Sequence, residues 1–246
     1  VAAYASGGYY REGDPIDLVV GEMSRYKDLG FTKFKIKIGG LPLEGDVARV
    51  AAVRDLIGPD AELALDANNA WQSSDEALRA IRRFEPYGIW WIEEPLSPDD
   101  IAGHADLVKR SPITVATGEI EATRWGFGDI LRAGGAEILQ PDACVAGGIS
   151  EWMKIAHLAG SFGRTVAPHW HANLHAELAA ATTNCTAVEY FALQEDIYNF
   201  EALLETEMKV EDGEILLSDL PGLGIVLNEE VVSEFALPDR SVVKSH

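Results

Sequence analysis

A regular alternation of short apolar segments with longer amphipathic segments is the feature that most constrains the fold of this chain. Each apolar segment is typical of a strand, and each segment that follows has helical periodicity. The pattern recurs about every 20–30 residues, which is the size of a βα unit. We expect eight strands, at residues 2–8, 33–39, 62–68, 90–95, 113–119, 138–143, 165–170 and 188–191.

Helix boundaries can be placed in several of the intervening segments. Pro15 follows Asp14 as a first helical residue after an N-cap, and Gly30 ends the segment. Comparable signals bound three further segments. The expected helices cover residues 15–29, 43–57, 74–84 and 149–162.

Alternating strands and helices predict a parallel sheet. Eight such units favour an α/β fold of the TIM type, a (β/α)8 barrel in its (β/α)7β variant, and 246 residues suffice for it. The alternative is an open, doubly wound sheet, but no GxGxxG motif follows the first strand, which weakens its dinucleotide-binding form. The barrel should cover residues 1–205, and residues 206–246 should form a hairpin and tail with Asp212 and Gly213 at the turn.

Composition excludes several classes of partner. The formal net charge is −20, from 40 acidic and 20 basic residues, which argues against nucleic acid. No apolar run approaches the roughly 20 residues that span a bilayer, and the segment from Val1 onward does not resemble a signal peptide. Cys144 and Cys185 match no metal-binding spacing. We expect both to be free thiols and the protein to be cytoplasmic.

Three acids end consecutive predicted strands: Asp66, Glu93 and Glu119. In barrels of this type the carboxyl ends of the strands form the active site, so these carboxylates should converge there. Carboxylates that lie close together repel one another unless a cation is bound between them. Oxygen ligands suit Mg²⁺, so the sequence predicts a magnesium site.

A lysine pair and a histidine–aspartate pair complete the predicted site. Lys35 and Lys37 alternate on one strand and so share a face, where their mutual repulsion and the nearby metal should lower the pKa of each, as a general base requires. Asp142 and His169 end adjacent strands, and the carboxylate should fix the tautomer of the ring. His171 and the nearby His175 could equally shape the pocket or be solvated.

With these residues assembled, the sequence resembles the mandelate racemase subgroup of the enolase superfamily, the mandelate racemase/muconate lactonizing enzyme family. Seven ordered motifs carry the resemblance, which covers nearly the whole chain. They are FKIKIGG (34–40), LDANNAW (65–71), WIEEPL (91–96), TGE (117–119), QPDACVAGG (140–148), APHW (167–170) and VEYF (188–191).

The resemblance implies roles for the acid/base residues. Lys37 is expected to be one acid/base, and His169 with Asp142 the other, on the opposite face of the substrate. Lys35 is expected to neutralise the substrate carboxylate, and Glu189 to hydrogen-bond the other carboxylate oxygen.

The resemblance also implies the metal ligands and the substrate contacts. Asp66, Glu93 and Glu119 are expected to hold one Mg²⁺ per site, with Mn²⁺ as a substitute. Asn68 should contact a substrate hydroxyl, and Trp170 is a further candidate for substrate binding. Other polar loop residues are available for hydroxyls: Tyr9, Tyr10, His171 and Asn173.

The implied activity is removal of the proton alpha to a substrate carboxylate. Dehydration of an acid sugar, an aldonate or aldarate, through a magnesium-stabilised enediolate is the leading interpretation. The alternatives are a racemase or epimerase of a 2-hydroxy or amino acid, and a non-catalytic barrel fragment. We also expect a homo-oligomer. Family members begin with a capping domain that this sequence lacks, so we expect the 246 residues alone to turn over weakly or not at all.

Overall fold

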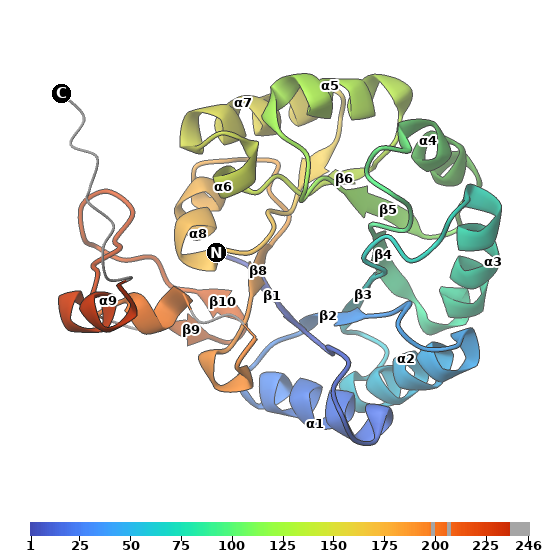
Figure 1. The fold of residues 1–246 in the computed structure, drawn as a ribbon, viewed down its shortest axis with the longest axis horizontal. Helices are drawn as coiled ribbons and strands as arrows, with labels where there is room; N and C mark the ends of the chain where they lie inside the picture. Colours follow the sequence, from blue (N-terminus) through green and yellow to red (C-terminus); the bar gives the residue numbers. More distant parts are fainter. Residues whose placement is uncertain (198–199, 206–207, 237–246) are drawn as a thin grey trace.

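The computed structural model describes residues 1–197, 200–205 and 208–236. An eight-stranded parallel sheet curls into a barrel, in the order β7-β6-β5-β4-β3-β2-β1-β8 (Figure 1). The strands are β1 (Ala3–Gly7), β2 (Lys33–Lys37), β3 (Glu62–Asp66), β4 (Ile89–Glu93), β5 (Thr114–Thr117), β6 (Ile138–Leu139), β7 (Thr165–Val166) and β8 (Val188–Tyr190).

The barrel closes between β7 and β8 through a connecting segment in place of a strand ladder. Val166 forms an isolated parallel bridge with Cys185. The Val166 N–H donates to the Asn184 carbonyl at 2.9 Å, and the Thr186 N–H donates to the Val166 carbonyl at 2.8 Å. Because β8 also pairs with β1, the eight strands enclose one interior, as the sequence predicts.

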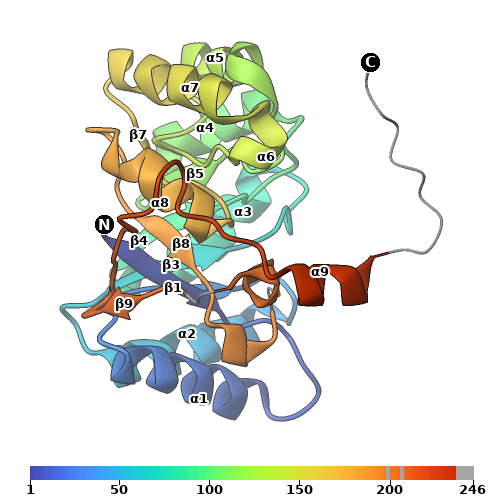
Figure 2. The ribbon, with the colours of Figure 1, turned by 90° about the vertical axis from the view of Figure 1, so that its left-hand side faces the viewer.

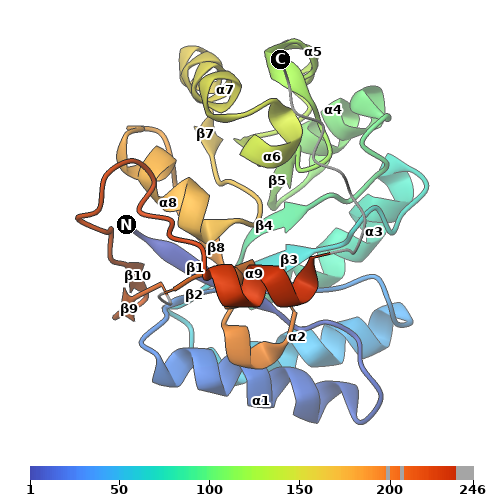
Figure 3. The same ribbon diagram turned by 60° about the vertical axis from the view of Figure 1, so that its left-hand side comes forward.

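Helices follow the first seven strands and surround the sheet, with α1 and α2 on one side and α4, α5 and α7 on the other (Figure 3). In the described part of the chain, short 3-10 helices follow β8, so the order is that of the predicted (β/α)7β variant. None of the described helices has both the length and the apolar character needed to cross a bilayer. The helices are α1 (Pro15–Asp28), α2 (Leu43–Ile57), α3 (Ser74–Phe84), η1 (Glu85–Tyr87), α4 (Ile101–Arg110), α5 (Thr123–Ala133), α6 (Ala143–Ala146), α7 (Ile149–Ser161), α8 (Ala172–Ala180), η2 (Leu193–Glu195), η3 (Phe200–Leu203) and α9 (Glu229–Phe235).

N-cap hydrogen bonds explain why the first residues of some helices could be predicted from the sequence. The Asp14 side chain accepts from the N–H groups of Ile16 and Asp17 at the start of α1, and Ser73 accepts from the Glu76 N–H at the start of α3. The bounds of α2 and α3 agree with the prediction, while α1 and α7 each end one residue earlier.

Aromatic side chains fill the barrel interior below the strand ends. Tyr4 and Trp91 are fully buried and meet edge to face, with ring centroids 5.2 Å apart. Small residues oppose them, including Ala64 and Ala116. This packed layer forms a floor, so the polar side chains above it are confined to the carboxyl-end mouth.

The hairpin that follows the barrel has the predicted turn. Strands β9 (Val210–Glu211) and β10 (Glu214–Ile215) are antiparallel. Asp212 and Gly213 between them have φ values of 49° and 73°, the left-handed pair of a tight hairpin turn. The Ala3 N–H donates to the Gly213 carbonyl at 3.2 Å, so the hairpin is attached to the first barrel strand.

The last described helix, α9, lies outside the ring of barrel helices (Figures 1 and 2). The predicted boundary at residue 206 and the end of the predicted tail, residues 237–246, fall outside the described residues. The resemblance implies that this tail packs on a capping domain, and this stays a prediction.

Candidate active site at the barrel mouth

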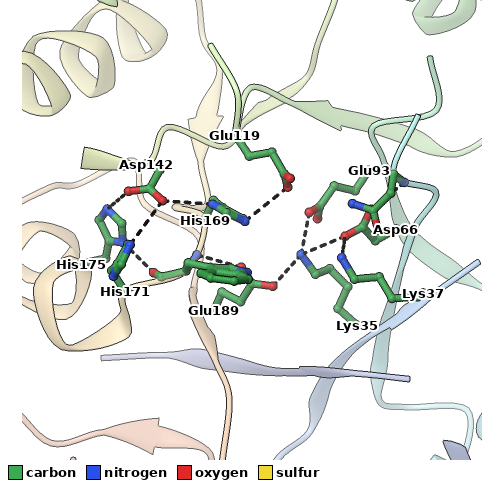
Figure 4. Close-up of polar contacts among 12 residues, drawn as sticks. Lys35, Lys37, Asp66, Glu93, Glu119, Asp142, His169, His171, His175 and Glu189 are labelled. Carbon is green, nitrogen blue, oxygen red and sulfur yellow. Dashed lines mark hydrogen bonds and ion pairs between the residues drawn. The ribbon is translucent and has the colours of Figure 1, made fainter. Parts of the chain in front are cut away.

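The predicted polar residues converge at the carboxyl ends of the strands (Figure 4). All eight predicted strands end too late, and β5, β6 and β7 end before Glu119, Asp142 and His169 are reached. These three residues lie on the loops that follow. A loop residue just after a strand still faces the mouth. The strands are therefore shorter than predicted, but the predicted site residues lie together.

The three acids meet in one cluster. Asp66 and Glu93 are the last residues of β3 and β4 and stand opposite each other in the strand register. Glu119 joins them from the loop after β5, and one carboxylate oxygen from each acid lies within 4.8 Å of the other two. The Trp91 Nε1–H donates to the second oxygen of Glu93 at 3.2 Å and fixes its orientation.

The electrostatics of this cluster fit a divalent cation. Burial raises the pKa of Glu119, and the charge of Glu93 adds to the effect, giving about 8. Burial and the charge of Asp66 also raise the pKa of Glu93. Glu119 Oε2 is buried and has no hydrogen-bond partner among the described residues, although His169 Nε2 lies 3.6 Å away. A hard cation between these oxygens would offset both the repulsion and the missing partner.

Both lysines of β2 pair with acids of the cluster. Lys35 Nζ lies 2.6 Å from Glu93, 2.7 Å from Glu189 and 3.7 Å from Asp66, and Lys37 Nζ lies 2.5 Å from Asp66. Burial lowers the pKa of each lysine, but the surrounding carboxylates outweigh it, and both pKa values lie above the ordinary value. Repulsion between the two ammonium groups therefore does not by itself lower the lysine pKa, because each ammonium contacts a carboxylate. The lowering that a bound metal would add stays a prediction.

Two tyrosines that sequence analysis did not connect with the lysines lie against them. Lys35 Nζ is 5.4 Å from the centre of the Tyr4 ring, and Lys37 Nζ is 4.9 Å from that of Tyr9. Rings in these positions favour the cationic form and limit the freedom of the side chain. Strand alternation gave a signal for Tyr4, since it stands opposite Glu189 in the pairing of β1 with β8.

His169 and Asp142 form the predicted pair. His169 Nδ1 lies 3.1 Å from Asp142 Oδ2, and the ring stacks on Trp170 with centroids 5.3 Å apart. Burial lowers the pKa of His169, but the hydrogen bond to Asp142 and the charges of Glu189 and Glu119 outweigh it, so the pKa is raised. The ring therefore holds a proton more firmly than a free histidine does.

Glu189 connects the two halves of the site. One carboxylate oxygen pairs with Lys35, and the other accepts the Trp170 N–H at 2.8 Å. Burial raises the pKa of Glu189, but Lys35 outweighs this and holds it at about 2. In these contacts Glu189 is an ionised acceptor, so the hydrogen bond to a substrate carboxylate that the resemblance implies would need a proton on Glu189.

The residues predicted to contact the substrate lie in different environments. Asn68 is exposed, and its N–H donates to Asp66 Oδ1 at 2.9 Å, so contact with a substrate hydroxyl stays a prediction. Tyr10 donates its hydroxyl to Asp46 Oδ1 at 2.5 Å and is already engaged. Trp170 has a φ of 51°, an uncommon backbone conformation for a bulky residue, and it lines the mouth beside His169.

His175 is structural. It is fully buried on α8, with Nδ1 at 2.7 Å from the Trp170 carbonyl and Nε2 accepting the Ala143 N–H at 3.0 Å. Both ring nitrogens are thereby used, and burial lowers the pKa of the ring to about 4. The neutral ring ties the loop of Asp142 to that of His169.

Comparison with known proteins identifies the family of the chain. The enolase C-terminal domain-like family matches residues 19–231. The chain is 34% identical to arabinonate dehydratase of Saccharolobus solfataricus and 36% identical to D-galactarolactone cycloisomerase of Agrobacterium fabrum, over 96% and 97% of its length. The crystal structure of L-talarate dehydratase from a Polaromonas species, complexed with Mg and L-glucarate, superposes with a TM-score of 0.85 at 36% identity over 95% of the chain.

The chain spans 63%, 66% and 63% of the lengths of these three proteins, just under two thirds of each. The family match nevertheless includes seven of the eight barrel strands and the full set of predicted acid, lysine and histidine positions. The resemblance seen in the seven motifs is confirmed, and the chain belongs to the enolase C-terminal domain-like family of mandelate racemase and muconate lactonizing enzyme relatives.

Proposed function

We propose that this protein removes the proton alpha to a substrate carboxylate and dehydrates an acid sugar, an aldonate or aldarate. The observation that carries the proposal is the placement of Lys37 on one side of the acid cluster and of His169, paired with Asp142, on the other (Figure 4). The names of the relatives, which include an arabinonate and an L-rhamnonate dehydratase, support the substrate class.

Asp66, Glu93 and Glu119 would hold one Mg²⁺, and Mn²⁺ shares the same preference for oxygen ligands. When bound, the ion supplies positive charge to the substrate carboxylate, which gains negative charge as the proton leaves. Related structures that contain magnesium support this choice of ion.

The side chains divide the remaining work. Lys35, buried beside Glu189, neutralises the substrate carboxylate, and Lys37 moves the alpha proton at Nζ. For that step Lys37 must be neutral, so the charge of Asp66 has to be shared with a cation, which lowers the lysine pKa. His169 Nε2 donates a proton to the leaving hydroxyl while Asp142 accepts the Nδ1–H.

The test is incubation of the 246 residues joined to a capping domain with magnesium and a panel of aldonates and aldarates in D₂O. Loss of the alpha proton and the neighbouring hydroxyl gives an enol that becomes a 2-keto-3-deoxy acid, which NMR detects. We expect one or a few members of the panel to give this product. Deuterium at the alpha carbon without loss of water would indicate the racemase or epimerase instead, and no exchange with any member would refute proton abstraction.

Magnesium should stabilise the fold, and Glu119→Gln should remove most of that gain. An ion at 100 times its dissociation constant adds about 2.7 kcal/mol to the free energy of unfolding by mass action. Thermal melts with and without Mg²⁺ measure the effect. Glu121→Gln, on the same loop but outside the cluster, is the matched control and should keep the full magnesium shift. Equal shifts in both variants would remove Glu119 from the ligand set.

Magnesium affinity should depend on pH through Glu119. Its carboxyl has a pKa of about 8, so below pH 8 it carries a proton that the ion must displace. Affinity therefore rises with pH, by up to tenfold per unit, and levels off above about pH 8. Calorimetric titrations in buffers of different ionisation enthalpy should find about one proton released at pH 6.5 and fewer at pH 9.

Three further proposals concern the protein beyond the site. We propose that it forms a homo-oligomer, that it acts in the cytoplasm, and that it works with an N-terminal capping domain that closes the mouth. For the second proposal, free thiols at Cys144 and Cys185 support a reducing compartment. Light scattering would give the oligomeric state. Turnover of the 246 residues with and without a joined capping domain would test the third proposal, with weak or no turnover expected for the 246 residues alone.

A further inference from the structure

A second cluster of metal-binding side chains lies beside the acid/base histidine. One donor atom from each of Asp142, Cys144 and His171 falls within 4.8 Å of the other two. Asp142 and Cys144 come from the loop after β6 and the start of α6, and His171 immediately precedes α8. Cys144 is exposed, so an ion from solvent can reach the cluster.

The hydrogen bonds of Asp142 determine which oxygen faces this cluster. Asp142 Oδ1 accepts the Cys144 N–H at 2.8 Å. Asp142 Oδ2 lies 3.1 Å from His169 Nδ1 and 3.9 Å from His171 Nε2 (Figure 4). His175 also approaches Asp142, at 3.9 Å, but its Nε2 accepts a backbone N–H and stays outside the ligand set. Oδ2 lies near both His169 and His171, so we take it as the oxygen that the acid/base pair and the second cluster share.

The donor types distinguish this cluster from the three acids. A thiolate, an imidazole and a carboxylate form a typical zinc set, with bonds of about 2.0–2.3 Å that place the ligand atoms roughly 3–4 Å apart. The present spacing within 4.8 Å needs only small side-chain rotations to reach that. Mg²⁺ prefers oxygen and would remain with the acids.

We infer that Asp142, Cys144 and His171 form a separate site for a zinc-like divalent cation, with its fourth position open to water. Binding releases the thiol proton to solvent and takes Asp142 Oδ2 from the His169 ring. The ion would then separate His169 from the carboxylate that orients it. This consequence for turnover rests on the proposed function, whereas binding itself does not.

The binding test uses Co²⁺ as a zinc substitute in the purified protein with excess Mg²⁺ present. A thiolate bound to Co²⁺ gives a charge-transfer absorption in the near ultraviolet. We expect this band to saturate at one Co²⁺ per chain and to disappear when Zn²⁺ is added. Cys144→Ser should abolish the band, and Cys185→Ser, the matched control, should keep it. His171→Asn should weaken Co²⁺ binding by at least about tenfold.

A missing band, a band that survives Cys144→Ser, or one that His171→Asn leaves unchanged would overturn the site, provided that circular dichroism shows each variant folded. Turnover is a separate arm: Zn²⁺ should inhibit the wild type in excess Mg²⁺ at least tenfold more strongly than it inhibits Cys144→Ser. A protein that shows the Co²⁺ band but dehydrates no substrate would retain the metal site and refute the proposed function alone.

Discussion

Replacing Lys37 with alanine lowers turnover by about 10²–10⁴-fold, the contribution of one positioned acid/base group. The side chain reaches the mouth at the end of β2, held between the Asp66 carboxylate and the Tyr9 ring. Alanine removes the only group that we place on that side to carry the alpha proton. Steady-state rates on the substrate found in the panel measure the loss.

The control for this variant is Lys33→Ala, which removes the same side chain from the opposite end of the same strand. Lys33 pairs with Glu62 away from the site, so this variant should keep near-normal turnover. Both variants should retain the magnesium-induced thermal shift. If Lys37→Ala retains more than half of the wild-type rate, the proton passes through another group.

Replacing His169 with asparagine lowers dehydration by a similar factor, because the leaving hydroxyl loses its proton donor. Lys37 remains in place on the other side, so exchange of the alpha proton with D₂O should continue while water is no longer lost. NMR follows exchange and dehydration in the same sample. His157→Asn, an exposed histidine on α7, is the matched control.

The same role predicts a pH dependence. In the proposed function His169 donates from its protonated form, and the hydrogen bond to Asp142 and the charges of Glu189 and Glu119 raise its pKa above the ordinary value. The dehydration rate should therefore fall as pH rises through this raised pKa, and not at the lower pH typical of a free histidine. A rate that climbs through that range would assign His169 the role of a base.

Local signals made parts of the fold predictable. The bounds of α2 and α3 follow from a stop at Gly58 and a cap at Ser73. Other helices gave weaker signals: α5 contains two glycines, which lower helix propensity, and in α8 the buried face consists mainly of alanine and a histidine, which contrast little with its polar face. The strand ends were overestimated because polar residues that face the mouth continue past the last ladder hydrogen bond.

The composition of the site was predictable because a parallel barrel brings all carboxyl strand ends to one mouth. The charge states of the site residues were not predictable, because they depend on which side chains are in contact. Sequence places Lys35 and Lys37 on one face but does not reveal that each ammonium contacts a carboxylate. Likewise, only the fold shows that both ring nitrogens of His175 form hydrogen bonds with backbone groups.

The closure between β7 and β8 has a consequence for motion. Around most of the barrel each strand is held by a continuous ladder, whereas here a single bridge between Val166 and Cys185 and its adjoining hydrogen bonds hold the wall together. Regions with few backbone bonds open at lower free energy than the rest of a domain. His169 follows this closure, whereas Lys37 lies on β2. Backbone amides beside the closure should therefore exchange with solvent sooner than those of β2. Opening of this segment would displace His169 while Lys37 stays in place. The stability of the closure would then determine how often the two proposed acid/base groups face each other.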